Sequence, residues 1–176
     1  MQPDRIMRNM HMYASRLRVG AAVPVCSIEK ATGKKGMWSA MPADIQIYNP
    51  KELGTPMGQY THVTRVRASE FLFIAGMLSG DANDNIVGEG DFDAQVEQVF
   101  KNVEAALRSA DAGWSNVVQF TTYLVHSQDI PKFMAFRKRA FPRMFPDGKY
   151  PPNTLLMVDR LVQEPFLVEV QTIAAI

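Results

Sequence analysis

From residue 45 onward, the chain alternates between strand-like and helix-like patterns of apolar residues. Short runs rich in β-branched and aromatic residues indicate strands, and apolar residues spaced three and four apart indicate helices. These patterns predict strands over 61–67, 70–78, 117–125, 154–161 and 166–174. They predict one helix that begins at Asp91 or Asp93 and ends near residues 111–113, and a second that begins near Asp129 and stops before Pro142. The predicted order is β-β-α-β-α-β-β.

Each predicted helix carries a single apolar stripe. In the first helix the stripe consists of Phe92, Val96, Val99, Phe100, Val103 and Leu107. In the second it consists of Phe133, Phe136 and Ala140. A single stripe is typical of a helix that covers one face of a sheet. We therefore expect a two-layer α+β domain with both helices on the same face of one sheet.

The face of the sheet without helices should also be buried. The segment 70–78 is apolar at both parities, with Leu72 and Ile74 on one face and Phe71 and Phe73 on the other. The chain has no further layer to cover the second of these faces. Another copy of the chain is the natural cover, so we expect a homo-oligomer.

Composition excludes several classes of protein. The 176 residues are 47% hydrophobic and 21% charged, as in an ordinary globular domain. No apolar run approaches the roughly 20 residues that cross a bilayer, so we expect a cytoplasmic protein without a membrane partner. The single cysteine permits no internal disulfide, and the three histidines lack the spacing of metal ligands. We expect neither a metal nor a cofactor.

Charge divides the chain into two parts. Residues 1–44 hold seven bases and three acids, whereas residues 45–176 hold 12 bases and 15 acids. A domain with a net charge of −3 is a poor candidate for binding nucleic acid. The first 44 residues also lack helix or strand periodicity. We interpret 1–44 as an extension preceding a domain over 45–176. The extension has three open interpretations: a flexible segment or upstream start before Met41, an Arg-rich transit peptide, or a short secretory signal.

Many short motifs of the domain match one family in order. They are Pro56, Gly58-Gln-Tyr60, FLFIAGMLSGD, Val87-Gly88, GDFDAQVEQVFKNVEAAL, VVQFTTYLV, Asp129, Tyr150-Pro-Pro-Asn153, Leu161 and VEVQTIA. Through them, the segment 45–176 resembles the RidA (YjgF) family. The resemblance implies a chorismate-mutase-like fold, with one mixed sheet and two helices on one face. It also implies a homotrimer with a central β barrel and small-molecule clefts between subunits.

The resemblance also implies an activity and the residues that carry it. The family's best-known reaction is hydrolysis of reactive enamines and imines, such as 2-aminoacrylate, to a 2-oxo acid and ammonia. Glu169 matches the acidic residue that positions the attacking water, and Tyr60 matches an aromatic residue that lines the cleft. Ala75, Gly76 and Met77 stand where the family has Ser-Gly-Gln.

One substrate-binding position departs from the deaminating branch of the family. Asn153 replaces the arginine that grips the substrate carboxylate there, and an amide carries no charge. Arg143, Lys149 and Arg160 are candidates for supplying the missing charge, the first two from the loop that precedes the strand. Arg160 is expected on the opposite face of its strand, because it lies seven residues past Asn153. The run Arg137-Lys138-Arg139 is expected on the solvent face of the second helix.

Three functions remain open from the sequence. The leading hypothesis is a trimer that binds a small metabolite between subunits and hydrolyses an imine or enamine with altered substrate preference. The second is a non-catalytic trimer that senses a metabolite through the same cleft. The third is a ribonuclease, which the net charge of −3 over residues 45–176 disfavours.

Overall fold

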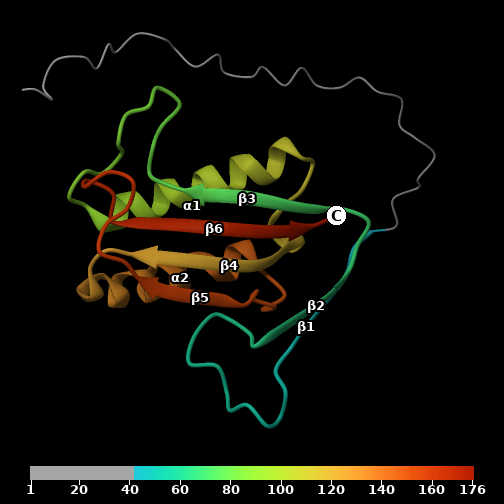
Figure 1. Ribbon diagram of the computed structural model, residues 1–176. Coiled ribbons are helices and arrows are strands. Elements are labelled where there is room, and N and C mark those ends of the chain that lie inside the picture. The colour runs from blue at the N-terminus through green and yellow to red at the C-terminus, as the bar shows by residue number, and fades with distance from the viewer. Residues whose placement is uncertain (1–41) are drawn as a thin grey trace, which may run out of the picture. The chain divides into compact units, whose positions relative to one another are not determined.

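The computed structural model describes residues 42–176 (Figure 1). Its strands are β1 (Asp44–Tyr48), β2 (Val63–Arg67), β3 (Phe71–Met77), β4 (Val117–Leu124), β5 (Asn153–Met157) and β6 (Val168–Ala175). Its two long helices are α1 (Phe92–Ser109) and α2 (Ile130–Met144). Neither is both long and apolar enough to cross a membrane.

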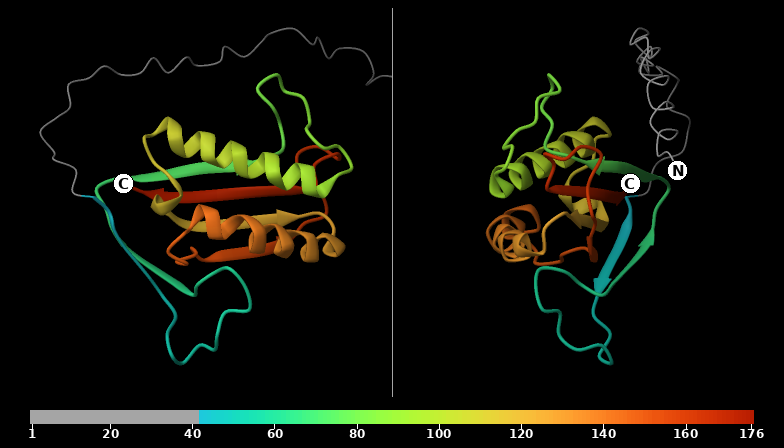
Figure 2. Two further views of the ribbon diagram at one scale, coloured as in Figure 1. Left: turned by 180° about the vertical axis from the view of Figure 1, so that it is seen from behind. Right: turned by 60° about the vertical axis from the view of Figure 1, so that its left-hand side comes forward.

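Four strands form the main sheet in the order β3-β6-β4-β5. β6 pairs antiparallel with β3 and β4, whereas β4 and β5 run parallel and are joined by α2, so the sheet is mixed. Both helices lie on one face of this sheet, as the view from behind shows (Figure 2). The predicted two-layer α+β arrangement is confirmed.

The first strand pair differs from the prediction of a single sheet. Residues 63–67 pair antiparallel with Asp44–Tyr48 in a separate two-stranded sheet. The sequence DIQIY has only short apolar alternation, and it lies beside the unpatterned extension. Its partner strand is more than a dozen residues away, so no local turn signal identifies the pair.

Aromatic rings fill the space between the helices and the sheet. The Phe100 ring of α1 lies 4.8 Å from Phe136 of α2, 5.8 Å from Phe120 of β4 and 6.1 Å from Trp114, measured between ring centroids. The stripe residues of both helices are buried, as their spacing predicts. This core holds the helices against one sheet face and leaves the other face open.

The observed helix ends agree only in part with those predicted from the sequence. The Asp91 carboxylate accepts hydrogen bonds from the backbone N–H groups of Asp93 and Ala94, so Asp91 is the N-cap of α1. The second helix, however, continues through Pro142 to Met144, beyond its predicted end. Phe141 and Phe145 are buried on either side of this last turn. Their packing outweighs the backbone hydrogen bond that the proline removes.

Candidate functional site

Glu169 lies on the open face of the main sheet, directly above the backbone of β3. A Cβ atom built on Gly76 would lie only 1.6 Å from Oε1 of Glu169. The β3–β6 register shifts between Ile74 and Met77, which is the irregularity that brings Gly76 under the carboxylate. Glycine is required here because only a residue without a side chain leaves room for the carboxylate.

Partial burial changes the acidity of this carboxylate. Desolvation raises the pKa of Glu169 above the usual range of a glutamate, because the charged form loses hydration. No ion pair joins Glu169 to a basic side chain of residues 42–176, so no cation offsets this effect. A carboxyl with a raised pKa exchanges protons more readily near neutral pH than an ordinary glutamate.

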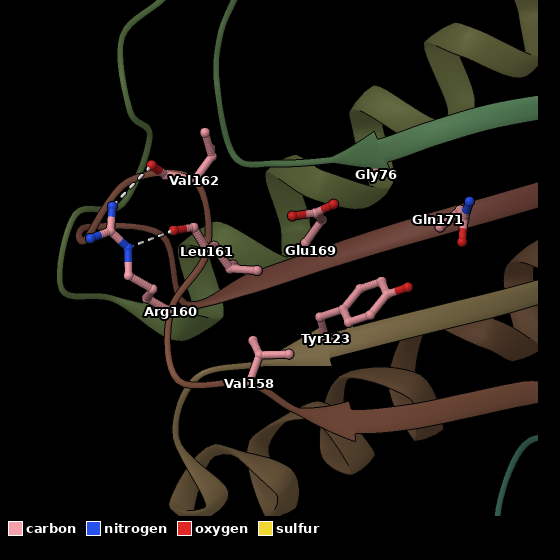
Figure 3. Close-up of a pocket in the computed structure, with 8 residues that line it drawn as sticks. All are labelled: Gly76, Tyr123, Val158, Arg160, Leu161, Val162, Glu169 and Gln171. Atoms are coloured by element: carbon pink, nitrogen blue, oxygen red, sulfur yellow. Dashed lines mark hydrogen bonds between the residues drawn. The ribbon is translucent and has the colours of Figure 1, made fainter.

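Glu169 opens onto a pocket of about 320 Å³ (Figure 3). The pocket is lined by Gly76, Tyr123, Val158, Arg160, Leu161, Val162, Glu169 and Gln171. Tyr123 of β4 stands directly opposite Glu169 in the strand register, so its phenol forms one wall. The 158–162 loop forms the far end. The pocket therefore combines one proton-exchanging carboxyl with polar and apolar walls.

Arg160 lies beyond the end of the strand that was predicted to hold it. β5 ends at Met157, so Arg160 belongs to the following loop and lines the same pocket as Glu169. Its guanidinium is engaged along that loop. Nε donates to the Leu161 carbonyl at 3.3 Å (Figure 3). Nη1 pairs with Glu164 at 3.1 Å. Arg160 thus holds the loop that closes one end of the pocket.

The structure brings together only part of the predicted site. Gly76 and Glu169 share the pocket, and Ala75 is exposed beside them on β3. Met77 instead packs against the core under the helices. Tyr60 and Asn153 do not line this pocket.

Tyr60 and Asn153 belong to a different part of the domain. The Tyr60 ring meets His62 edge-on, with 5.8 Å between ring centroids. At the start of β5, Oδ1 of Asn153 accepts a hydrogen bond of 2.8 Å from Oγ1 of Thr122. β5 is an edge strand of the main sheet, and Gly76 lies on the opposite edge strand. The predicted site is therefore divided between the two edges of one chain's sheet.

The two loop candidates for the missing charge lie outside the Glu169 pocket. Arg143 lines a groove on the outer side of the helix layer, together with Glu97 and Trp114. Lys149 is exposed, and its Nζ lies 3.9 Å from a carboxylate oxygen of Asp147. Neither side chain lines the pocket that holds Glu169.

Arg137 corrects a second expectation. It is buried, with 2% of its surface exposed, whereas its neighbours Lys138 and Arg139 lie on the solvent face as predicted.

Tyr123 and Gln171 line the Glu169 pocket but were not predicted from the sequence. The signal for both was available, because Gln171 shares the parity of Glu169 on its strand and Tyr123 alternates with core residues of β4.

Among residues 42–176, the structure shows no group of three or more histidine, cysteine, aspartate or glutamate side chains placed to hold a metal ion. The side chains that line the pocket provide one half-buried carboxyl, one phenol, one amide, the guanidinium of Arg160 and three apolar groups.

Comparison with known proteins identifies the family. The family model described as endoribonuclease L-PSP matches residues 51–176. A RutC family protein of Synechocystis is 30% identical over 133 residues, which cover 75% of this chain and 97% of that protein. The chain belongs to the RidA (YjgF) family. A solved structure of a conserved Rid family protein from Yersinia pestis has a TM-score of 0.67 at 27% identity, covering 75% of this chain and 98% of that chain.

A further relative of the RidA family is named for an activity. The 3-aminoacrylate deaminase RutC of Acinetobacter baylyi is 25% identical over 129 residues, which cover 71% of this chain and 98% of that protein.

Proposed function

We propose that this RidA-family chain hydrolyses a small imine or enamine to a carbonyl compound and ammonia, at clefts completed by a neighbouring copy. The observation that carries the proposal is the half-buried Glu169 carboxyl, which lies over Gly76 and opens into a pocket of about 320 Å³. The deaminase named among its relatives supports the reaction class.

The proposed chemistry needs a positioned water and one proton carrier. The Glu169 carboxylate accepts a proton from water as the water oxygen bonds to the imine carbon, and the C=N electron pair moves to nitrogen. The carboxyl then returns the proton to nitrogen. The hydroxyl of the resulting carbinolamine then passes its proton, through the carboxylate, to the amino nitrogen. As the C=O bond forms, the C–N bond breaks and ammonia leaves. An enamine first takes a proton at its β-carbon and loses one from nitrogen, which gives the imine. The raised pKa of Glu169 suits both halves of this exchange.

A second copy of the chain supplies the other half of the proposed cleft. Tyr60 and Asn153 match substrate-contacting positions of the family, yet they lie apart from Glu169 within one chain. The open sheet face between the two edges exposes Phe71 and Phe73, by 46% and 79%. Covering these rings with another copy would bury apolar surface and could bring the Tyr60 half of one copy to the Glu169 half of another. The homotrimer expected for the family has this arrangement.

Substituting Asn153 tests whether a charge at this position controls substrate choice. We expect Asn153→Arg to raise hydrolysis of carboxylate-bearing imines by about ten- to a hundredfold, because a charge-assisted pair replaces a neutral amide. The assay generates imines with an amino-acid oxidase and measures how far the protein competes with semicarbazide for them. Asn116→Arg, at a partly buried asparagine outside the pocket, is the matched control for the added charge. Equal rates for wild type and Asn153→Arg would contradict this role of position 153.

The second candidate is a non-catalytic trimer that binds a metabolite in the same cleft. It is favoured by the three departures from the family's motif, at Ala75, Met77 and Asn153. The same assay separates the two functions. A protein that is inert toward every imine, before and after Asn153→Arg, but still binds a small 2-oxo acid would be such a sensor.

A further inference from the structure

Arg137 is a buried cation without a carboxylate partner. It lies on the inner side of α2 with 2% of its surface exposed, and no ion pair involves it anywhere in residues 42–176. Its guanidinium carbon lies 4.7 Å from the centroid of the Phe141 ring and 5.5 Å from that of Phe133. The guanidinium is therefore held between aromatic faces and out of water.

The hydrogen bonds of Arg137 are incomplete. Nη2 donates to the backbone carbonyl of Gln59, but Nε is buried and has no partner. A buried donor without an acceptor is unfavourable, and a buried charge without a counterion is more so. Burial lowers the pKa of Arg137 to about 10, so the side chain still carries its charge at neutral pH. The surroundings thus lack an anion.

A second unsatisfied group lies on the segment that covers Arg137. Nδ1 of His62 is buried without a hydrogen-bond partner, and its ring meets Tyr60, the residue next to Gln59. The Tyr60 phenol is close enough to Arg137 to affect its pKa. Two buried nitrogen atoms without partners, both near one tyrosine, are typical of a site that takes a polar ligand.

This cluster adjoins the start of β5. Phe141, on which Arg137 stacks, lies 6.0 Å from the Tyr150 ring, and the Tyr150 carbonyl accepts a 2.8 Å hydrogen bond from Thr61. Asn153 follows three residues after Tyr150. Arg137 therefore belongs to the same half of the proposed cleft as Tyr60 and Asn153.

The segment over the guanidinium is tied to it through one backbone group. Gln59 contributes a single carbonyl oxygen to it, and the preceding residues are solvent-exposed, with 49% of Leu53 and 90% of Met57 accessible. A ligand carboxylate that displaced this carbonyl would offer two oxygens with a full charge, which matches the planar fork of a guanidinium.

We infer that Arg137, assisted by His62, binds the carboxylate of the substrate in place of the arginine that Asn153 replaces. The substrate is then an imine or enamine with a free carboxylate, rather than an uncharged one. This assignment rests on the proposed function for the identity of the cleft, but carboxylate binding itself can be measured without catalysis.

Calorimetric titration of the full-length protein tests the assignment with 2-oxobutyrate as the carboxylate probe and 2-butanone as its uncharged counterpart. We expect Arg137→Met to weaken 2-oxobutyrate binding by about ten- to a hundredfold and to remove the preference over 2-butanone. Arg139→Met is the control, because Arg139 lies on the same helix and already pairs with Glu97 at 2.6 Å. Its affinity should match that of the wild type.

Further measurements distinguish a role of Arg137 in ligand binding from a role in folding, and binding of a carboxylate from binding of phosphate. Should Arg137→Met fail to fold, Arg137→Lys keeps the charge but loses the bidentate fork, and it should also weaken 2-oxobutyrate binding. A purely structural arginine would change the melting temperature without changing the preference for 2-oxobutyrate over 2-butanone. Unchanged affinity in both Arg137 variants, no binding by the wild type, or tighter binding of inorganic phosphate than of 2-oxobutyrate would each overturn the inference. Binding without imine hydrolysis would refute only the proposed reaction.

Discussion

Glu169→Gln is expected to lower imine hydrolysis by about a hundred- to ten-thousandfold, the range typical of a positioned general base. The amide fills the same space above Gly76 but cannot accept a proton from water. Semicarbazide competition measures the loss. Glu104→Gln, on the distant helix α1, is the control and should retain the wild-type rate. A Glu169→Gln variant with unchanged activity would remove this carboxyl from the mechanism.

The pH dependence of the wild type provides a second readout of the same variant. Burial raises the pKa of Glu169, so the carboxylate is lost by protonation at a higher pH than in an ordinary glutamate. As the pH falls, kcat/KM should therefore begin to decline above the usual glutamate range. The residual activity of Glu169→Gln should lack that decline. An acid limb that persists in the variant would assign the titration to another group.

Phe73→Asp is expected to break the oligomer into single chains and to abolish hydrolysis with it. Phe73 is the most exposed aromatic residue of the open sheet face, and Phe71 and Leu156 are also exposed. Burying a phenylalanine is worth about 1.5–3 kcal/mol, and a charge in its place would have to be desolvated. Light scattering coupled to size-exclusion chromatography measures the mass.

Ala105→Asp is the control for Phe73→Asp, because it adds the same charge to the exposed side of α1. It should leave both the mass and the activity of the wild-type protein unchanged. If the wild type is a single chain at micromolar concentration, or Phe73→Asp retains the wild-type mass, the open face is not the interface.

Local patterns were sufficient to predict the layers of the fold. The stripe from Phe92 to Leu107 predicted the inner face of α1. The apolar residues on both sides of 70–78 predicted a second apolar face that the chain itself does not cover. The strand at Asp44–Tyr48 was not predicted, because it forms only by pairing with residues far along the chain. The last turn of α2 was not predicted either, because Pro142 favours the end of a helix locally. The burial of Phe141 and Phe145 outweighs that preference.

The site was harder to predict than the fold. Parity counting assumed that β5 continued beyond Met157, whereas Arg160 lies on the following loop and lines a pocket that Asn153 does not reach. Its charge led to the prediction that Arg137 faces solvent, yet its guanidinium lies against the rings of Phe133 and Phe141. Three consecutive residues point in directions about 100° apart around a helix. Only the packing of the covering segment shows which one is buried. The resemblance to a family singled out Glu169, since alternation alone suggests a solvent-facing glutamate, but only the structure places it over Gly76.

The most direct test of a cleft shared between copies is a crystal structure of the wild-type protein with 2-oxobutyrate. The account predicts the keto carbon beside Glu169 of one copy, with Tyr60 and Arg137 of a neighbouring copy around the carboxylate. A ligand enclosed within a single chain, or one bound away from Glu169, would contradict it.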